Sequence, residues 1–215
     1  MKYLTIVFLF FIFTATSFSQ YSVRAGMGIS FVSMPSLTDY LNQNFVPPDQ
    51  QLGAFNSSVV FSGEGYLAVS KNYEIGLEVA YLLNSYTFDY TLGHYQMSYD
   101  IIMPSLTGYY VISGTGFNFK FGAGIGPRFV NVNETLPARP AADNYTSTGF
   151  GILFKADGNT LLSGNLYANI GADLRYDFNG EPKNGGKHLF NNVYGKNVNM
   201  NSFSAGIRLG VTYIF

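Results

Sequence analysis

Few of the side chains that usually perform catalysis occur in this sequence. The chain has no cysteine and only two histidines, His94 and His188, so thiol nucleophiles, thiolate metal sites and disulfides are excluded. Ser98, His94 and Asp100 form a Ser/His/acid set within one short segment. A nucleophile, its base and the orienting acid must converge in space, and crowding in one segment does not provide that geometry. We therefore predict no catalytic residue, no metal site and no cofactor.

One glycine-rich segment could be mistaken for a phosphate-binding loop. GAGIGP, residues 122–127, has glycines at alternate positions, but a dinucleotide-binding loop must join a strand to a helix. Here the glycines alternate with apolar residues inside a strand pattern, so no cofactor is expected. The formal net charge of -1 gives no reason to expect nucleic acid as a partner.

Most of the other polar and charged residues alternate with apolar ones. From Phe203 to Phe215 every second residue is apolar, and small or polar residues lie between them. This period of two is typical of a β-strand with two unlike faces. The same pattern, clear or weaker, predicts seven more strands at about 21–31, 59–70, 74–83, 99–112, 117–129, 148–161 and 166–178.

The connections between these strands alternate in length. Short turns containing Gly or Asn are predicted at 70–73, 113–116 and 162–165. Long polar loops are predicted at 33–56, 85–98, 131–147 and 179–199. Short turns at one end and long loops at the other are typical of transmembrane barrels. The fold class is therefore predicted to be all-β, an eight-stranded antiparallel up-and-down transmembrane β-barrel.

The two strand faces distinguish this fold from a soluble barrel with an apolar interior. The polar faces hold twelve of the 25 charged residues: Arg24, Glu64, Glu74, Glu78, Lys120, Arg128, Lys155, Asp157, Asp173, Arg175, Asp177 and Arg208. Between them lie mainly Gly, Ser, Ala and Asn, which suit a cramped barrel interior. The opposite faces are large, apolar and nearly free of charge, as lipid requires. We therefore predict that the polar face points inward.

The twelve predicted interior charges comprise six basic and six acidic residues. A buried charge needs a partner, and a balanced set predicts a salt-bridged interior that is closed or holds only pockets of water. A narrow, gated channel is the alternative, although an open selective pore more often shows an excess of one sign.

Residues 1–19 have the features of a secretory signal peptide. Lys2 precedes an apolar run from Leu4 to Phe13, which is too short to span a bilayer. Cleavage is expected near Ser19/Gln20. The predicted domains are a signal peptide over 1–19 and a transmembrane β-barrel over 20–215.

With these features, the chain resembles the small bacterial outer-membrane barrels of the OmpA/OmpX-like class. In that class the last strand ends in Phe, has apolar residues at alternate positions and is recognised by the barrel-assembly machinery. Val211, Tyr213 and Phe215 match this signal. The resemblance implies a location in the bacterial outer membrane, with lipid and the assembly machinery as partners. The segment SFSQ and the Asn- and Tyr-rich loops resemble proteins of Bacteroidota.

Two predicted outer loops contain apolar side chains at regular spacing. In 35–45, Leu37, Tyr40, Leu41 and Phe45 have near-helical spacing, and Ser36 is a candidate N-cap. This helix could lie on the membrane or the barrel mouth, or form a folded loop cap. A protruding hairpin is predicted over 85–100, with a possible aromatic mouth on its inner side formed by Tyr86, Phe88, Tyr90, Tyr95, Met97 and Tyr99. Packing that orders the loops is the alternative.

Pro104 and Pro127 lie in successive strands at similar distances from the turn at 113–116. Each lacks a backbone N–H, so together they predict a possible lateral gap in the barrel wall; the alternative is a bulge.

The expected function is non-enzymatic: envelope integrity, or surface interaction with a ligand bound by the long loops. The alternative is a narrow, porin-like or laterally gated channel for small hydrophobic molecules, and a lipid-modifying enzyme is a third hypothesis.

Overall fold

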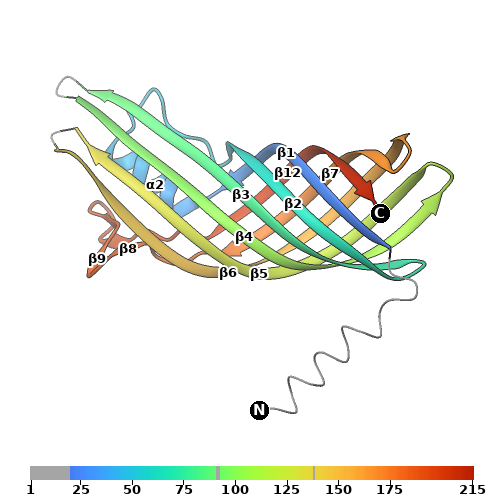
Figure 1. Ribbon diagram of the computed structural model, residues 1–215. Helices are drawn as coiled ribbons and strands as arrows, with labels where there is room; N and C mark the ends of the chain where they lie inside the picture. The colour runs from blue at the N-terminus through green and yellow to red at the C-terminus, as the bar shows by residue number, and fades with distance from the viewer. Residues whose placement is uncertain (1–19, 91–92, 138) are drawn as a thin grey trace, which may run out of the picture.

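Eight long antiparallel strands close into a barrel in the computed structural model (Figure 1). The structure describes residues 20–90, 93–137 and 139–215, so the predicted signal peptide lies outside the described residues. Around the ring the order is β1, β2, β3, β4, β5, β6, β7 and β12, and β12 pairs back to β1. The strands are β1 Tyr21–Ser33, β2 Asn56–Ser70, β3 Tyr73–Tyr90, β4 Gly93–Gly114, β5 Phe117–Leu136, β6 Arg139–Ser163, β7 Leu166–Phe178 and β12 Ser202–Ile214.

The predicted terminal strand closes the barrel. It pairs with β1 in an unbroken register from Ser22–Ile214 to Ser33–Phe203. Closure satisfies backbone groups that would otherwise face lipid unpaired. The alternating pattern places apolar side chains outside, where Leu106 and Leu209 are each 63% exposed, and polar side chains inside. The predicted fold class is thus confirmed.

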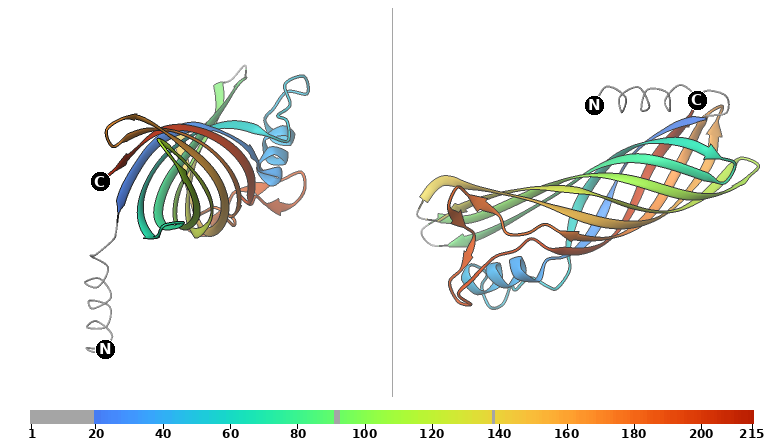
Figure 2. Two further views of the ribbon diagram at one scale, coloured as in Figure 1. Left: turned by 90° about the vertical axis from the view of Figure 1, so that its right-hand side faces the viewer. Right: turned by 90° about the horizontal axis from the view of Figure 1, so that it is seen from below.

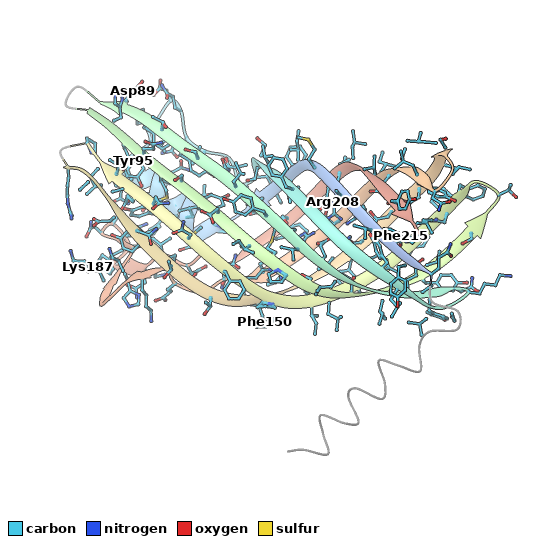
Figure 3. The ribbon with its side chains drawn as sticks, viewed as in Figure 1. Asp89, Tyr95, Phe150, Lys187, Arg208 and Phe215 are labelled. Atoms are coloured by element: carbon cyan, nitrogen blue, oxygen red, sulfur yellow. The ribbon has the colours of Figure 1, made fainter. Side chains whose placement is uncertain are left out.

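Short turns join the strands at one end of the barrel. They lie at residues 71–72, 115–116 and 164–165, within the segments predicted for turns. Gly116 and Gly164 have φ angles of +77° and +53°, in the left-handed region that glycine enters without a steric penalty. The C-terminal Phe215 lies at this same end (Figure 3).

Strands β3 to β6 extend far beyond their neighbours at the other end of the barrel (Figure 1). The 25 residues of β6 span about 83 Å and the 13 residues of β1 about 43 Å at 3.3 Å per residue. The predicted loop over 131–147 is therefore wrong, because β5 continues to Leu136 and β6 begins at Arg139. The segment 85–98 likewise consists of strand on both sides of residues 91–92, which agrees with the predicted protruding hairpin.

The outer face of this extension is polar, unlike the outer face of the barrel below it. Asn131 and Asn133 on β5 face outward beyond Phe129. The side-chain amide of Asn144 on β6 donates to the side-chain oxygens of both, at 2.5 and 2.9 Å. The apolar band thus ends near Phe129, and the extension lies outside the membrane-spanning part. Because the outward residues are polar here, the segment lacks the contrast between faces that marks a strand, and the sequence resembles a loop. The inward residues nevertheless continue at alternate positions.

The remaining elements lie at the loop end. Helix α2, Pro35–Asn44, follows β1. The connection from β7 to β12 forms two small hairpins with the strands β8 Lys183–Asn184, β9 Lys187–His188, β10 Phe190–Asn191 and β11 Lys196–Asn197. Figure 2 shows α2 and these hairpins beside each other under the extension. Among the described residues, no helix has the length and apolarity needed to cross a membrane.

The predicted helix is present, but its predicted cap is wrong. The N-cap position is Met34, with no side-chain hydrogen bond, and Pro35 occupies the first turn, where proline needs no backbone donor. The hydroxyl of Ser36 instead accepts a hydrogen bond from the backbone N–H of Asn199, at 3.1 Å. Ser36 therefore ties α2 to the connection before β12.

Candidate functional site

All twelve charged residues of the polar strand faces point into the barrel, and each contacts a residue of opposite charge. Eleven of them are at most 5% exposed, and the Glu74 side chain is 17% exposed. Figure 3 labels Arg208 among the side chains that fill the lumen. Six positive and six negative groups give a lumen with no net formal charge.

Two carboxylates form the centre of this network. Glu64 on β2 and Glu78 on β3 lie directly opposite each other in register, an arrangement that by itself is destabilising for like charges. Two cations offset the repulsion: Arg24 on the adjacent strand β1, directly opposite Glu64 in register, and Lys155 from β6 across the lumen. The Lys155 ammonium contacts both carboxylates, at 2.5 Å for Glu64. One Arg24 nitrogen contacts both as well, at 2.7 and 3.1 Å.

Glu78 also receives two guanidinium groups from the opposite side of the ring. Arg175 donates to it at 2.7 Å and Arg208 at 3.1 Å. The same two arginines contact Asp173, at 2.5 and 3.2 Å. Arg24 reaches Asp157 at 2.6 Å. One connected network therefore ties six of the eight barrel strands together across the lumen.

Two further pairs lie outside this central network. Lys120 contacts Glu74 at 2.6 Å, and its ammonium lies 4.0 Å from the ring centre of Tyr66, a cation–π contact. Arg128 pairs with Asp177. Since the side chains of these pairs and of the network cross the lumen, ions would meet paired charges along the barrel axis.

The two prolines face each other across the β4–β5 boundary. Backbone pairing stops after Ile102–Phe129 and resumes at Leu106–Ile125, although every residue between is described. The register is unchanged, so Pro104 lies opposite Pro127 without a bulge between these pairs. A Cβ on Gly126 would lie 2.0 Å from the Pro104 carbonyl oxygen, so the chain needs glycine for this close approach.

Arg128 supplies hydrogen bonds at this interruption. Its Nη1 donates to the carbonyl oxygens of Pro104 and Pro127 at 3.3 and 3.0 Å. It also donates to Gly126 O and Ser105 Oγ, each at 3.2 Å. The wall at Pro104 and Pro127 thus lacks backbone pairing between the strands, but hydrogen bonds from the inward Arg128 side chain connect the two strands there.

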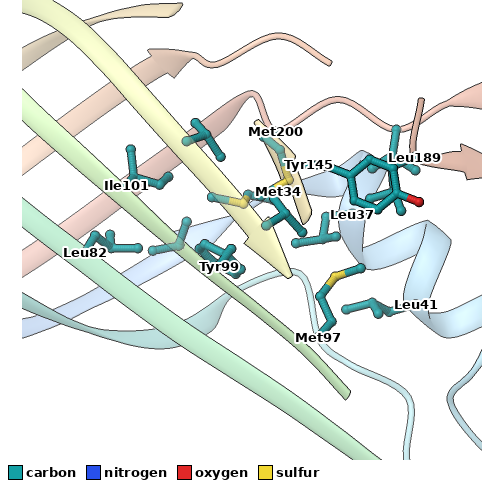
Figure 4. Close-up of a cluster of buried hydrophobic side chains, with 14 of the residues drawn as sticks. Met34, Leu37, Leu41, Leu82, Met97, Tyr99, Ile101, Tyr145, Leu189 and Met200 are labelled. Carbon is teal, nitrogen blue, oxygen red and sulfur yellow. The ribbon is translucent and has the colours of Figure 1, made fainter. Parts of the chain in front are cut away.

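An apolar cap fills the barrel above the charges (Figure 4). We use this name for the buried cluster of inward residues of β1 to β6, α2 and the β7–β12 connection. Tyr95, Met97 and Tyr99 are at most 2% exposed, and Tyr86 and Phe88 pack against them. The side chain of Tyr90 lies outside the described part of the structure. These residues form a closed core, so the predicted aromatic mouth is not open.

Helix α2 covers the cap through its apolar face. Leu37, Tyr40 and Leu41 are buried, and Phe45 stacks on Tyr95 with ring centres 3.7 Å apart. The helix therefore lies against the barrel extension as a folded cap.

One buried carboxyl group beside the cap was not predicted as a site residue. Glu134 on β5 is 5% exposed and accepts hydrogen bonds from the hydroxyls of Tyr40 and Tyr95, at 2.5 and 2.8 Å. Burial, and secondarily the nearby Asp143, raises the pKa of the Glu134 carboxyl above its ordinary value, against the lowering effect of the two hydrogen bonds. Burial and the neighbouring Glu134 raise the pKa of both tyrosine hydroxyls, which therefore remain donors. The sequence contained one signal for Glu134: it follows Val130 and Val132 at alternate positions and so continues the inward face of β5.

The Ser/His/acid set does not come together. His94 and Ser98 lie on one face of β4, about 13 Å apart at 3.3 Å per residue. The His94 ring nitrogen lies 2.5 Å from Asp89, and Asp100 accepts a hydrogen bond from Asn131. Among the described residues, no group of three or more His, Cys, Asp or Glu side chains could hold a metal ion.

Comparisons with known proteins identify the fold. No protein-family model matches the chain, and no curated protein matches it. Ail, the attachment invasion locus protein of Yersinia pestis, superposes with a TM-score of 0.54 at 10% identity, over 92% of this chain and 99% of that one. Neisserial surface protein A gives 0.51 at 12%, over 93% and 100%. A major outer membrane protein from Thermus thermophilus gives 0.50 at 18%, over 92% and 100%.

These proteins share a fold with this chain at low identity. The chain therefore has the fold of a small outer-membrane-type β-barrel, similar to the fold of these three proteins. Its lumen is filled by paired charges, and its loop end is closed by an apolar cap.

Proposed function

We propose that the protein is a non-enzymatic component of the bacterial outer membrane that does not conduct through its lumen and acts through its loop end. The observation that supports this most strongly is the pairing of all twelve lumen charges. Opening a path would expose charges that now neutralise one another, which costs several kcal/mol for each ion left buried without its partner. The extension, α2 and the β7–β12 connection then form the part of the molecule available for envelope support or surface binding.

The orientation and the expected partners follow from the same proposal. Long loops face the cell exterior and short turns face the periplasm in transmembrane barrels. Outer-membrane lipid would surround the apolar band, and the barrel-assembly machinery would recognise Val211, Tyr213 and Phe215. Cleavage of the signal peptide near Ser19/Gln20 belongs to this proposal too. Ail is an attachment invasion locus protein, in keeping with a surface role for this fold.

Planar-bilayer recording tests the closed lumen. We expect no single-channel steps from the pure refolded protein, while a large porin added to the same bilayer gives steps and shows that the assay works. Reproducible steps from several preparations would overturn the proposal.

Analysis of lipid A from an overexpressing strain tests the absence of enzyme activity, and we expect an unchanged mass spectrum.

A passage for small hydrophobic molecules is a second candidate, and one observation favours it. Met103 and Val130 of the apolar cap flank the unpaired segment at Pro104 and Pro127. A molecule could therefore enter the cap and leave sideways into lipid beside Arg128, without crossing the central charge network around Glu64 and Glu78.

Uptake of a hydrophobic dye by cells tests the second candidate. Pro127→Val adds the missing backbone donor and should close the wall if the gap is used. Pro47→Val, in the connection after α2, is the matched control. Reduced uptake with the first variant alone would favour transport, whereas equal uptake in both variants and in a deletion strain would exclude it.

A further inference from the structure

A cleft of about 570 Å³ lies on the outer wall of the barrel at its loop end. Its walls come from the end of β1, the start of α2, the ends of β7 and β12 that adjoin the loops, and the β10–β11 hairpin. Its volume lies in the range of about 300–1,000 Å³ typical of small-molecule sites. None of the charged lumen residues lines it, so the cleft is separate from the network described above.

Two asparagines present hydrogen-bond donors to this cleft in a fixed orientation. The side-chain oxygen of Asn201 accepts from the backbone N–H of Gly180 at 3.0 Å. The side-chain oxygen of Asn199 accepts from the backbone N–H of Asn201 at 3.2 Å. Because a backbone N–H can only donate, these contacts decide which end of each amide is the oxygen. Both NH₂ groups remain unused by hydrogen bonds within the described residues.

The charges around the cleft are balanced. Asp39 on α2 and Lys196 on β11 line it, both are exposed, and neither forms an ion pair within the described part of the chain. One carboxylate and one ammonium supply an acceptor and a donor without a strong field of either sign. A densely sulfated or phosphorylated ligand would need a cluster of basic residues instead.

Aromatic rings border the cleft on its membrane side. Tyr176 on β7 and Phe203 on β12 are 44% and 40% exposed and belong to the outward apolar face near the loop end. Tyr194 adds a third ring from the connection between β10 and β11, at 54% exposed. Rings combined with adaptable polar groups suit a ligand with both apolar faces and many hydroxyls.

We propose that this cleft binds a neutral or weakly charged saccharide. Ring hydroxyls would accept from the Asn199 and Asn201 amides and donate to Asp39, while the apolar face of a sugar ring would contact Tyr176 or Phe203. The cleft lies beside the outward apolar rings of Tyr176 and Phe203, at the loop end of the barrel. The saccharide could therefore be the headgroup of an outer-leaflet glycolipid or a free saccharide at the cell surface. This inference rests on the proposed surface role and specifies its ligand class.

Binding to the refolded protein in phosphatidylcholine nanodiscs tests the inference. A panel of neutral, amino-sugar and highly sulfated oligosaccharides is titrated by calorimetry, and nanodiscs that also contain purified outer-membrane glycolipid provide the second arm. Binding only to the glycolipid or only to a free sugar supports the site and identifies the source. No binding in either arm would overturn the inference, as would binding restricted to a highly sulfated saccharide.

Matched variants locate the binding. Asn199→Asp and Asn201→Asp keep the oxygen that accepts the backbone N–H but replace the free donor, and we expect affinity to fall about tenfold in each. Asn165→Asp makes the same change in the turn at the opposite end of the barrel and should leave affinity unchanged. Equal affinity in all three variants would refute this location. Heat-modifiable gel mobility checks that each variant is folded.

A single tryptophan provides an independent signal. The chain contains no Trp, so Tyr194→Trp places the sole indole at the cleft. Saccharide binding should shift its emission, and no shift at saturating saccharide would contradict the proposed position. If the protein inserts into the membrane without conducting but binds no saccharide, the saccharide site is wrong and the proposed function is unaffected. If the protein binds saccharide but gives channel steps, the closed lumen is wrong and the saccharide site is unaffected.

Discussion

Glu64 and Glu78 show how single residues determine the state of the lumen. Their carboxylates face each other on adjacent strands, and Lys155 and Arg24 each contact both. Glu64 also accepts hydrogen bonds from Tyr66, Thr107 and Tyr109, at 2.9, 2.7 and 2.5 Å. Small neighbours leave the space that these long side chains need: a Cβ on Gly76 would lie 3.0 Å from a Glu64 oxygen.

Removing the charge of Glu78 should destabilise the barrel strongly. Glu78→Gln leaves four cations without their shared carboxylate, and losing one partner of a buried pair costs about 3–5 kcal/mol. Glu74→Gln is the matched control. Among the described residues Glu74 forms an ion pair with Lys120 alone, and it is partly exposed, so the loss of stability should be smaller. Urea unfolding in lipid vesicles measures both. Equal losses for the two variants would contradict the central role of Glu78.

The raised pKa of Glu134 predicts a pH dependence of the docking of α2. A carboxyl whose pKa is higher in the folded state adds stability that is complete below its unfolded pKa, about 4.3. This contribution is lost as the pH rises through the folded value. The titratable and charged groups around it are Tyr40, Tyr95, Tyr145, Asp143 and Arg139.

Hydrogen exchange of α2 measures this effect. After correction for intrinsic exchange, protection of residues 35–45 should fall as the pH rises from the acid range toward neutrality. Glu134→Gln, which stays uncharged, should remove that dependence. Asp100→Asn, on the outer face of β4, is the control and should retain it. An identical pH profile in the wild type and Glu134→Gln would contradict the prediction.

At the scale of elements, the extension and α2 form a second folding region above the barrel. The strands of the extension continue the pairing of β3, β4, β5 and β6. The apolar cap instead depends on side chains from α2 and the β7–β12 connection, including Leu189 and Met200. Docking α2 therefore requires tertiary contacts, whereas the barrel below requires only strand pairing and its own lumen contacts.

Leu41→Ala should release α2 without unfolding the barrel. Leu41 is fully buried, and truncating a buried leucine costs about 2–5 kcal/mol. We expect faster hydrogen exchange and faster chymotrypsin cleavage within residues 35–45, with unchanged heat-modifiable mobility of the barrel. Gln43→Ala, on the exposed face of the helix, should behave as the wild type. Loss of heat-modifiable mobility in Leu41→Ala would show that the two regions are not separable.

At the scale of the whole molecule, ring closure unites residues from both ends of the described chain. The backbone N–H of Phe215 donates to Tyr21 O at 2.8 Å, and that of Ile214 donates to Asn165 O at 3.0 Å. The Phe215 side chain is 69% exposed and contacts the Tyr213 ring. An exposed ring contributes little to packing, which suits a role in recognition during assembly.

Deleting Phe215 should therefore impair assembly more than stability. We expect a large loss of barrel in the outer membrane of cells but a nearly unchanged unfolding midpoint for the refolded protein. Phe117→Ala removes another exposed ring at the turn end of the barrel and should assemble normally. Equal loss of assembly and of the unfolding midpoint on deletion would count against a recognition role.

The residue pattern alone was sufficient for the fold class, the closing strand, the turns and the inward direction of the charges. These features depend on the period of two and on the high cost of charge in lipid, both of which are local properties of each strand. Segment 131–147 was predicted wrongly, because its outward residues become polar once the strand leaves the membrane. Outside lipid, a polar outer face no longer distinguishes a strand from a loop.

Only the tertiary structure decided which charged side chains pair with each other and that these pairs fill the lumen. Glu78 contacts Arg24, Lys155, Arg175 and Arg208 from four other strands, and strand spacing in the sequence does not predict which side chains meet across a barrel. The same holds for Glu134 beneath α2, Arg128 at the proline interruption and the outer cleft. The sequence determined which face each residue occupies, since that follows from the alternation within a strand. The partners depended on register, shear and the docking of α2, which arise only when the ring closes.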